Sequence, residues 1–263
     1  MIVHRNGRDA TADDLAPLAF AGYAHFTAAQ VRGGRIRGLD LHLERLRVAS
    51  LELFGRSLPD EVVRGQLRTA LAAGPPDVSL TATVYSSAGE FTAADGADLD
   101  LLVRTGPPST GPDGPLALAV VEHERYLPAV KHVGEVAKTH VLRGASATGY
   151  DDAAFLDRRG RLSEASIWNL AFWDGTAVVW PVADVLGGVT MGIVRRQLTA
   201  RGVPQREAEV TPGGVADLAG AVVMNSWTPG VAVHRLGDVP VPVAPGFVTL
   251  LHDAYAAEPL TAP

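Results

Sequence analysis

The chain has 263 residues, of which 47% are hydrophobic and 20% charged, a composition typical of folded globular proteins rather than disordered or fibrous ones. Its 23 basic and 29 acidic residues give a formal net charge of −6, which argues against binding to a nucleic-acid backbone, so no nucleic-acid partner is expected. The absence of cysteine excludes disulfides, thiolate nucleophiles and cysteine-based zinc sites.

The N-terminal part of the chain predicts a small α+β domain. Apolar residues recur near a 3.6-residue period in two segments, which indicates two helices, and Gly55 provides a stop signal after the first. The expected elements, in chain order, are an apolar strand within Leu18–Val31, a hairpin turn at Arg32–Arg35 followed by a second strand, helices over His42–Phe54 and Glu61–Ala73, and strands at Ser79–Tyr85 and Asp98–Arg104.

Glycine and proline dominate residues 106–115, whose sequence is GPPSTGPDGP. Clusters of these residues punctuate secondary structure and are common in linkers. We therefore expect a small N-terminal domain at 1–107, a linker at 108–116 and a large C-terminal domain at 117–263.

The C-terminal part predicts a sheet-rich domain with three helices. The expected elements are a strand at Leu116–Val121, a helix at Val133–Thr148, short strands at Ala153–Leu156, Asn169–Trp173 and Ala177–Trp180, a helix from Thr190 to about Ala200, strands at Val222–Met224 and Val231–His234, and a helix from about Gly246 to Ala257. On the helix at Val133–Thr148, the periodicity places Val136, Val141 and Ala145 on one face and Lys138 on the opposite, polar face.

Membrane, export and metal functions find no support in the sequence. No apolar run approaches the roughly 18 to 20 residues that cross a bilayer, so no membrane partner is expected. Residues 1–7 lack the basic and apolar regions of a secretory signal, and we expect a cytoplasmic protein. None of the eight histidines falls in an HExxH motif, and the pair His132 and His140 is more typical of a solvated helix face, so no metal site is expected.

Lysine is rare in this chain. Only Lys131 and Lys138 are lysines among the 23 basic residues. A lysine retained where arginine serves elsewhere is a candidate for the chemistry that a guanidinium cannot perform, namely attack by a deprotonated amine. Survival of the two lysines by chance is the alternative that composition leaves open.

A series of motifs, in a fixed order, resembles those of the class IV (fold type IV) enzymes that use pyridoxal 5′-phosphate (PLP). The motifs are His25-Phe26-Thr27, His42-Leu43-Glu44-Arg45-Leu46, Lys131 with Gly149-Tyr150-Asp151-Asp152-Ala153, Asp157 to Asn169 (DRRGRLSEASIWN), and Leu186-Gly187-Gly188-Val189-Thr190, followed by Asn225-Ser226. The family includes branched-chain aminotransferases, D-amino-acid aminotransferase and aminodeoxychorismate lyase. The resemblance covers nearly the whole chain and implies an α+β fold of type IV, with a small α/β domain, a larger sheet-rich domain, a cofactor cleft between the domains, and a homodimer.

The resemblance also implies which residues hold the cofactor. Lys131 would form the Schiff base with PLP and later transfer the substrate proton, and its apolar setting at Leu127–Val130 favours a neutral amine. Glu164 would accept a hydrogen bond from the pyridine nitrogen, and Arg45 would bind the phosphate. Ser166, Val189, Thr190 and Ser226 complete the expected cofactor-binding set.

Alternative interpretations of these residues remain open. A surface or salt-bridging role is the alternative for Lys131, and Lys138 is a competing lysine that the spacing to Gly149 disfavours. Glu164 alone would suit a loop carboxylate, and Arg45 a solvated helix face. The loop at Gly187–Thr190 depends less on the family, because amides at a helix N-terminus and a threonine hydroxyl form an anion site by themselves.

Aromatic residues and a threonine are the expected substrate contacts. Phe26 and Thr27 would line the substrate pocket from the small domain, and Trp168 and Trp227 from the large one. Aromatic residues at such positions are also common in the core, so packing is the alternative role.

Several positions depart from the family pattern. The segment Val84–Ser87 lacks the arginine that binds the substrate carboxylate in D-amino-acid aminotransferases. Met191 stands where many members carry arginine, Gly134 where asparagine is frequent, and Ala165 where glycine follows the glutamate. These differences predict a divergent member with its own substrate rather than a standard branched-chain aminotransferase.

The sequence therefore predicts a PLP-dependent aminotransferase that moves an amino group between an amino acid and a 2-oxo acid. A related enzyme, aminodeoxychorismate lyase, which forms 4-aminobenzoate, is the first alternative, because His25–Ala29 and Asn225-Ser226 also resemble that branch. A descendant of the fold that binds no cofactor and serves as a scaffold is the second, and the joint presence of Lys131, Glu164, Arg45 and Thr190 argues against it.

Overall fold

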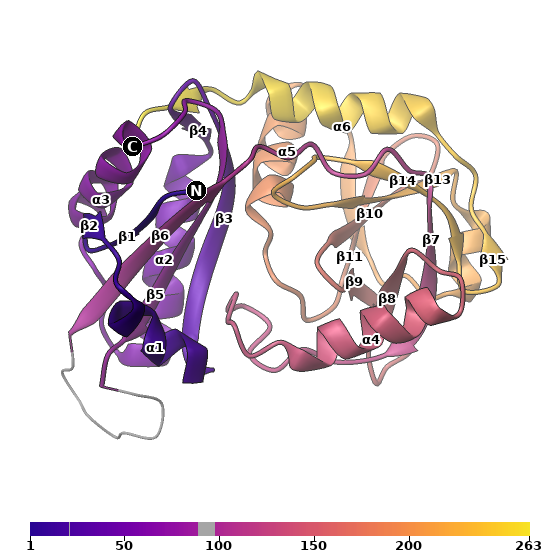
Figure 1. Cartoon of the computed structure of the whole chain (residues 1–263). Coiled ribbons are helices and arrows are strands. Elements are labelled where there is room, and N and C mark those ends of the chain that lie inside the picture. The colour runs from indigo at the N-terminus through magenta and orange to yellow at the C-terminus, as the bar shows by residue number, and fades with distance from the viewer. Residues whose placement is uncertain (21, 89–97) are drawn as a thin grey trace. The chain divides into compact units, whose positions relative to one another are not determined.

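The computed structural model describes residues 1–20, 22–88 and 98–263 (Figure 1). These residues form two compact units, each with its own sheet. The first unit contains Met1–Ser109, Val130–Gly134 and Pro259–Pro263, and the second contains Thr110–Ala129 and Glu135–Glu258. The linear division expected from the sequence did not assign the two short segments to the first unit.

The first unit is built on a seven-stranded sheet in the order β16-β4-β3-β5-β6-β1-β2. Its strands are β1 (Val3–Arg5), β2 (Arg8–Asp9), β3 (Ala24–Arg32), β4 (Arg35–Arg37), β5 (Val78–Ser86), β6 (Leu99–Gly106) and β16 (Leu260–Thr261), and all neighbours are antiparallel. Buried and partly buried residues alternate along β3, as expected for a strand with two different faces.

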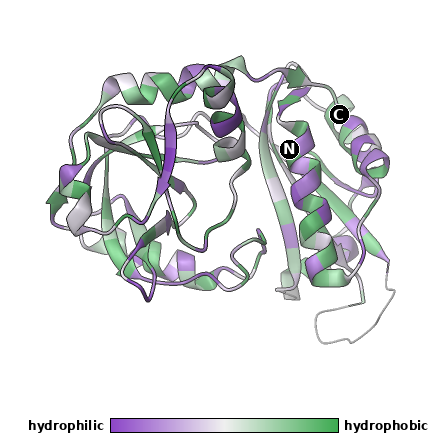
Figure 2. Cartoon of the chain, turned by 180° about the vertical axis from the view of Figure 1, so that it is seen from behind, coloured by the Kyte–Doolittle hydropathy of each residue, from purple (hydrophilic) through white to green (hydrophobic). Residues whose placement is uncertain are grey.

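The described residues of the first unit form three helices: α1 (Ala12–Phe20), α2 (Leu39–Phe54) and α3 (Asp60–Ala72). Helices α2 and α3 pack on the sheet with buried leucines, among them Leu43, Leu46 and Leu67 (Figure 1). Both helices also carry hydrophilic residues along their length, as Figure 2 shows. The two helices predicted from periodicity are therefore confirmed, and Gly55 ends α2 in the left-handed conformation.

Two further expectations for this unit have different outcomes. The turn at Arg32–Arg35 is confirmed, since Gly33 and Gly34 both have positive φ angles, 58° and 71°, which suit the tight turn of a hairpin. The strand expected within Leu18–Val31 begins only at Ala24, because α1 occupies the chain up to Phe20. An apolar stretch of this length does not by its composition distinguish the last turn of a helix from a strand.

The second unit is built on a nine-stranded sheet that closes on itself. The path runs β12-β11-β10-β13-β14-β7-β8-β9 with β15 beside β14, and β9 also pairs with β10, so that β10, β13, β14, β7, β8 and β9 form a closed ring. The strands are β7 (Leu116–Glu122), β8 (Asp152–Leu156), β9 (Leu162–Ala165), β10 (Asn169–Trp173), β11 (Val178–Pro181), β12 (Gln205–Ala208), β13 (Gly220–Met224), β14 (Val231–Leu236) and β15 (Val239–Pro240). Closure removes the exposed strand edges of the ring.

Three α-helices surround this sheet: α4 (Val136–Ala147), α5 (Val189–Ala200) and α6 (Pro245–Ala257). Helices α5 and α6 lie next to each other and share a core with β10, β11 and β13, to which Val194, Trp180 and Leu251 contribute. Helix α4 packs on β8. Among the described residues, no helix is both long and apolar enough to cross a membrane.

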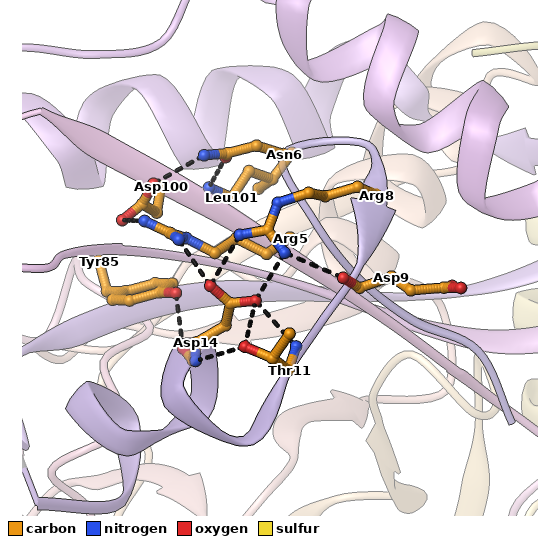
Figure 3. A network of polar contacts seen from close by, with 9 residues as sticks. All are labelled: Arg5, Asn6, Arg8, Asp9, Thr11, Asp14, Tyr85, Asp100 and Leu101. Atoms are coloured by element: carbon orange, nitrogen blue, oxygen red, sulfur yellow. Dashed lines mark hydrogen bonds and ion pairs between the residues drawn. The ribbon is translucent and has the colours of Figure 1, made fainter.

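Asp14 at the start of α1 ties the first strands of the sheet together (Figure 3). Its buried carboxylate accepts hydrogen bonds from Arg5 at 2.6 Å, from Arg8 at 2.8 Å and from the Thr11 amide at 2.8 Å. Arg5 also donates to Asp100 on β6 at 2.9 Å. The guanidinium of Arg8 and the Thr11 amide hold the pKa of Asp14 well below its usual range.

We therefore expect the substitution Asp14→Asn to lower the melting temperature of the protein by roughly 5 °C near neutral pH. The carboxylate has a depressed pKa in the folded chain, so its contribution is present above the unfolded value near 4 and is lost as the pH falls. Thermal unfolding at pH 7 and pH 3 measures both effects, and the difference in melting temperature between wild type and variant should be smaller at the lower pH. Asp13→Asn, at an exposed position in the same turn, is the matched control; an equal loss in both variants would contradict the role of Asp14.

Candidate functional site

A buried ion pair lies in the second unit at the end of the barrel strand β9. Lys138 on α4 places Nζ 2.7 Å from Oε1 of Glu164, and the two side chains are only 8% and 5% exposed. The guanidinium of Arg125 reaches the same carboxylate oxygen at 3.6 Å. Both cations approach Oε1, so the second oxygen of Glu164, Oε2, retains its lone pairs for another hydrogen-bond donor.

The expectation that Lys138 lies on the polar face of its helix is wrong. Lys138 is buried with Ala145, seven residues later, and its Nζ lies 5.5 Å from the ring centroid of Phe155, whereas Val136 is 83% exposed. The helix is amphipathic around a different stripe, because a buried lysine with a carboxylate partner can occupy a position that periodicity assigns to apolar residues. The helix also starts at Val136, later than the predicted Val133.

Further charged residues surround this pair. Arg125 forms an ion pair with Glu135, with Nη2 2.7 Å from Oε1, and the Arg125 side chain is buried. His123 lies close by, with its ring 4.5 Å from that of Phe155. Burial lowers the pKa of His123, and the positive charge of Lys138 lowers it further.

Asn169 at the start of β10 connects the carboxylate to the loop before α5. It pairs with Glu164 across the two strands, and its Nδ2 donates to the carbonyl of Leu186 at 2.7 Å. A Cβ atom added at Gly188 would overlap Oδ1 of Asn169. The loop thus approaches Asn169 as closely as the absence of a side chain at Gly188 permits.

The N-terminus of α5 lies against a turn formed by residues 225–228. Gly188 caps the helix without any side-chain hydrogen bond, and Val189 and Thr190 are buried. The hydroxyl of Thr190 donates to the carbonyl of Asn225 at 2.8 Å. Ser226 is half-buried in this turn. The first amides of α5 are therefore positioned, by a fixed turn, at a helix end suited to an anion.

The two tryptophans expected to contact substrate lie together. The rings of Trp168 and Trp227 meet edge to face at 5.8 Å between centroids. Trp168 is buried and donates its indole hydrogen to Asp152 at 2.8 Å, whereas Trp227 is 41% exposed. Trp168 is thus fixed by packing and a hydrogen bond, and Trp227 retains surface for a ligand.

Ser166 has a buried hydroxyl group without a hydrogen-bond partner in the described part of the chain. The residue is 1% exposed, its amide donates to the carbonyl of Ala153 at 3.1 Å, and its Oγ has no hydrogen-bond partner among the described residues. A buried hydroxyl without a partner is energetically costly, so this atom is a candidate ligand contact.

In the first unit, the segment Val130–Gly134 lies along β3. The amide of Phe26 donates to the carbonyl of Lys131 at 2.8 Å, and the amide of Val133 donates to Ala24 at 2.9 Å. Nζ of Lys131 lies 4.9 Å from the centre of the Phe26 ring. Lys131 and Phe26, predicted separately as cofactor lysine and pocket residue, are therefore direct neighbours.

Thr27 lies on the other face of β3, toward α2. Its hydroxyl is 2.7 Å from Nδ1 of His42, and both side chains are buried. Burial, with a smaller effect of the Arg45 charge, lowers the pKa of His42 to about 3. His25, whose Nε2 is 2.8 Å from the hydroxyl of Ser50, has its pKa lowered to about 4 by burial. Arg45 itself is half-buried on α2.

The predicted site residues therefore form two groups. Lys131, Phe26, Thr27 and Arg45 belong to the first unit, and Glu164, Ser166, Val189, Thr190, Ser226, Trp168 and Trp227 belong to the second. Sequence reasoning missed Lys138 and Asn169 as members of the second group. Their signals were present, since Lys138 is one of only two lysines and Asn169 ends the motif that contains Glu164.

The family model for class IV amino-transferases matches residues 24–236. The chain belongs to this family. In sequence, no curated protein gives a significant match. The family assignment confirms the resemblance expected from the motifs, the enzyme class, and pyridoxal 5′-phosphate as the cofactor of that class.

Solved structures confirm the expected α+β fold of the class IV enzymes. A branched-chain amino acid aminotransferase from Escherichia coli superposes with a TM-score of 0.83 at 15% identity, covering 97% of this chain and 92% of that one. A 4-amino-4-deoxychorismate lyase from Pseudomonas aeruginosa gives 0.81 at 22% identity, with 96% and 97% covered. A hypothetical aminotransferase from Mycobacterium tuberculosis in a PLP-bound form gives 0.77 at 20% identity, with 98% and 99% covered.

The donor set of the second unit fits this class of cofactor. A phosphorylated pyridine needs an acceptor for its ring nitrogen and amide or hydroxyl donors for its phosphate. Glu164 offers Oε2, α5 offers its N-terminal amides, and Ser166 offers a hydroxyl without a partner.

The contact between Gly188 and Asn169 gives a test of the loop before α5. We expect Gly188→Ala to displace the loop, because the new methyl group would overlap Oδ1 of Asn169, and to weaken PLP binding by roughly tenfold or more. Equilibrium dialysis with PLP measures the change. Gly187→Ala is the matched control, since a Cβ there meets no atom within 4 Å. Equal affinity in the two variants would show that this close approach does not shape the anion site.

The buried histidines predict a loss of stability in acid. His42 and His25 have pKa values of about 3 and about 4 in the folded chain, below the ordinary value of 6.5. The unfolded chain takes up protons first, so stability is complete above pH 6.5 and falls as the pH drops toward the folded values. For His42 alone the loss reaches about 2 kcal/mol at pH 5.

Urea unfolding at pH 7.5 and pH 5 measures this difference. We expect His42→Asn, which keeps a polar partner for Thr27 but does not titrate, to lose about 2 kcal/mol less than the wild type between the two pH values. His140→Asn, at an exposed position of α4, should behave as the wild type. An unchanged pH dependence in His42→Asn would contradict a neutral buried imidazole.

Proposed function

We propose that the protein is a PLP-dependent aminotransferase that moves an amino group between an amino acid and a 2-oxo acid, with Lys131 as the lysine that binds the cofactor covalently. The family assignment supports the enzyme class. The observation that carries the proposal is the buried carboxylate of Glu164, held by Lys138 with one oxygen still available as an acceptor.

Each predicted residue has a role in this proposal. Bound PLP supplies the electron-withdrawing ring that stabilises negative charge at the substrate α-carbon. Glu164 accepts the hydrogen bond of the ring nitrogen. The phosphate is bound by the amides of Val189 and Thr190 with the side chains of Ser166, Ser226 and Arg45.

Proton transfer is the part of the reaction that the protein itself performs. With PLP bound, the amine of Lys131 would take the proton from the substrate α-carbon and hold it for return, a task for which an amine is suited and a guanidinium is not. Phe26, beside Lys131, and the exposed surface of Trp227 bind the substrate side chain, while Trp168 supports Trp227 and Thr27 fixes β3 against α2.

The partners in this proposal are small molecules and a second copy of the chain. An amino acid and a 2-oxo acid are the substrates, and the family resemblance implies a homodimer working in the cytoplasm. The departures at Met191, Gly134 and Ala165 favour a substrate of this chain's own rather than those of a standard branched-chain aminotransferase.

Borohydride reduction tests the role of Lys131. We expect reduction of the PLP-loaded protein to attach the cofactor to Lys131, as peptide mass spectrometry would show, and Lys131→Arg to lower turnover by at least about 100-fold. The Lys138→Arg variant should still carry the reduced cofactor on Lys131, and it should still show the visible absorbance band of bound PLP. Cofactor attached to Lys138 instead would overturn the assignment.

A pair of assays separates the two related reactions. Conversion of bound PLP to pyridoxamine phosphate by an amino acid, reversed by a 2-oxo acid, is the expected result. Release of pyruvate and 4-aminobenzoate from aminodeoxychorismate without that conversion would replace the aminotransferase with the lyase. Absence of any cofactor band would overturn both.

A further inference from the structure

We propose that Lys138 is a positioning residue that orients Glu164 and weakens its hold on the proton of the cofactor ring nitrogen. The inference rests on the proposed function, in which Glu164 binds that nitrogen, and adds a residue to which no role had been assigned. It is carried by the contact of 2.7 Å between Nζ of Lys138 and Oε1 of Glu164.

The pair is built as a fixed element of the second unit. Both side chains are almost completely buried, one on α4 and the other on the barrel strand β9. Removing two charges from water is costly, so such a pair persists only where each charge compensates the other at short range. Because Lys138 binds Oε1, the carboxylate has one preferred orientation, with Oε2 as the oxygen available to the ring nitrogen.

The neighbouring charges show that the carboxylate is neutralised on one side. Arg125 approaches Oε1 at 3.6 Å but also binds Glu135 at 2.7 Å, so its charge is shared. Lys138, by contrast, has Glu164 as its ion-pair partner among the described residues. His123, the remaining titratable group of the cluster, has its pKa lowered by burial and by the charge of Lys138. The cluster therefore contains two cations and two anions, and is close to neutral with a neutral imidazole.

A neutralised carboxylate is a weaker partner for a protonated ring than a carboxylate with its full charge. An isolated Glu164 would favour the protonated pyridine by a charge–charge attraction that is large in a desolvated site. The ammonium of Lys138, close to the same carboxylate, opposes the second positive charge that ring protonation creates. Lys138 thus reduces the strength of the cofactor as an electron sink while it keeps Glu164 in place.

Two probes that differ only at the ring nitrogen isolate this effect. Pyridoxamine 5′-phosphate and its 1-deaza analogue, in which CH replaces the nitrogen, bind without a covalent bond to Lys131. The ratio of their dissociation constants measures the contribution of the nitrogen. We expect Lys138→Met to increase the preference for the nitrogen-containing ring by roughly tenfold, the effect of one partly screened charge in such a site.

Matched variants separate this role from a structural one. Lys138→Arg keeps the charge and should retain the wild-type ratio, and Arg143→Met, which removes a charge from an exposed position of α4, should not alter it. If Lys138 served packing alone, both dissociation constants in Lys138→Met would change in parallel and the ratio would stay constant, which would overturn the proposal. Failure of the wild type to bind either probe would overturn the proposed function together with this inference, and is distinguishable from an unchanged ratio.

A second pair of variants avoids an uncompensated buried carboxylate. Glu164→Gln leaves Lys138 charged beside a neutral amide, and the double variant Glu164→Gln with Lys138→Met leaves no charge in the pair. The double variant should prefer the nitrogen-containing ring several-fold more than Glu164→Gln alone. Equal ratios in the two would also overturn the role assigned to Lys138.

Discussion

The pairing of Glu164 with Asn169 is the constraint on which the second unit depends. This contact between β9 and β10 closes six strands into a ring. The same two residues carry the site, since Glu164 receives Lys138 and Asn169 holds the loop before α5. A shift of register by one residue between β9 and β10 would turn one of these two side chains to the opposite face. Closure of the barrel and the geometry of the site therefore depend on the same pairing.

The loop before α5 extends this requirement to the helix N-terminus that we propose as the phosphate site. Asn169 binds Leu186 and leaves no room for a side chain at Gly188, which fixes where the helix begins. Thr190 then binds the carbonyl of Asn225, so the turn at residues 225–228 is positioned from the same helix end. Segments far apart in the sequence are thereby joined by few hydrogen bonds, each made by a short side chain with little conformational freedom to lose.

Much of the fold was accessible from the sequence because its helices and hairpins obey local rules. The periodicity of α2 and α3 and the two glycines after Arg32 specify local structure with little help from the rest of the chain. The family motifs likewise indicated Glu164, Val189 and Thr190, which the structure places in one unit. Local rules failed at α1, where composition did not distinguish helix from strand.

The buried face of α4 was not accessible by the same reasoning. A lysine is assigned to solvent unless its partner is known, and the partner of Lys138 is 26 residues away on another element. Only the tertiary contact reveals that the position is internal. The sequence also did not predict that the segments Val130–Gly134 and Pro259–Pro263 belong to the first unit. The strands with which they pair, β3 and β4, are remote from them in sequence.

The return of the chain end to the first unit has a consequence for the order of events during synthesis. Strand β16 pairs with β4, and the carbonyl of Pro263 accepts a hydrogen bond from Arg68 on α3. When every residue up to the end of α6 has left the ribosome, β16, an edge strand of the first unit, has not yet left it. The first unit therefore receives its last strand only after every element of the second unit has been synthesised.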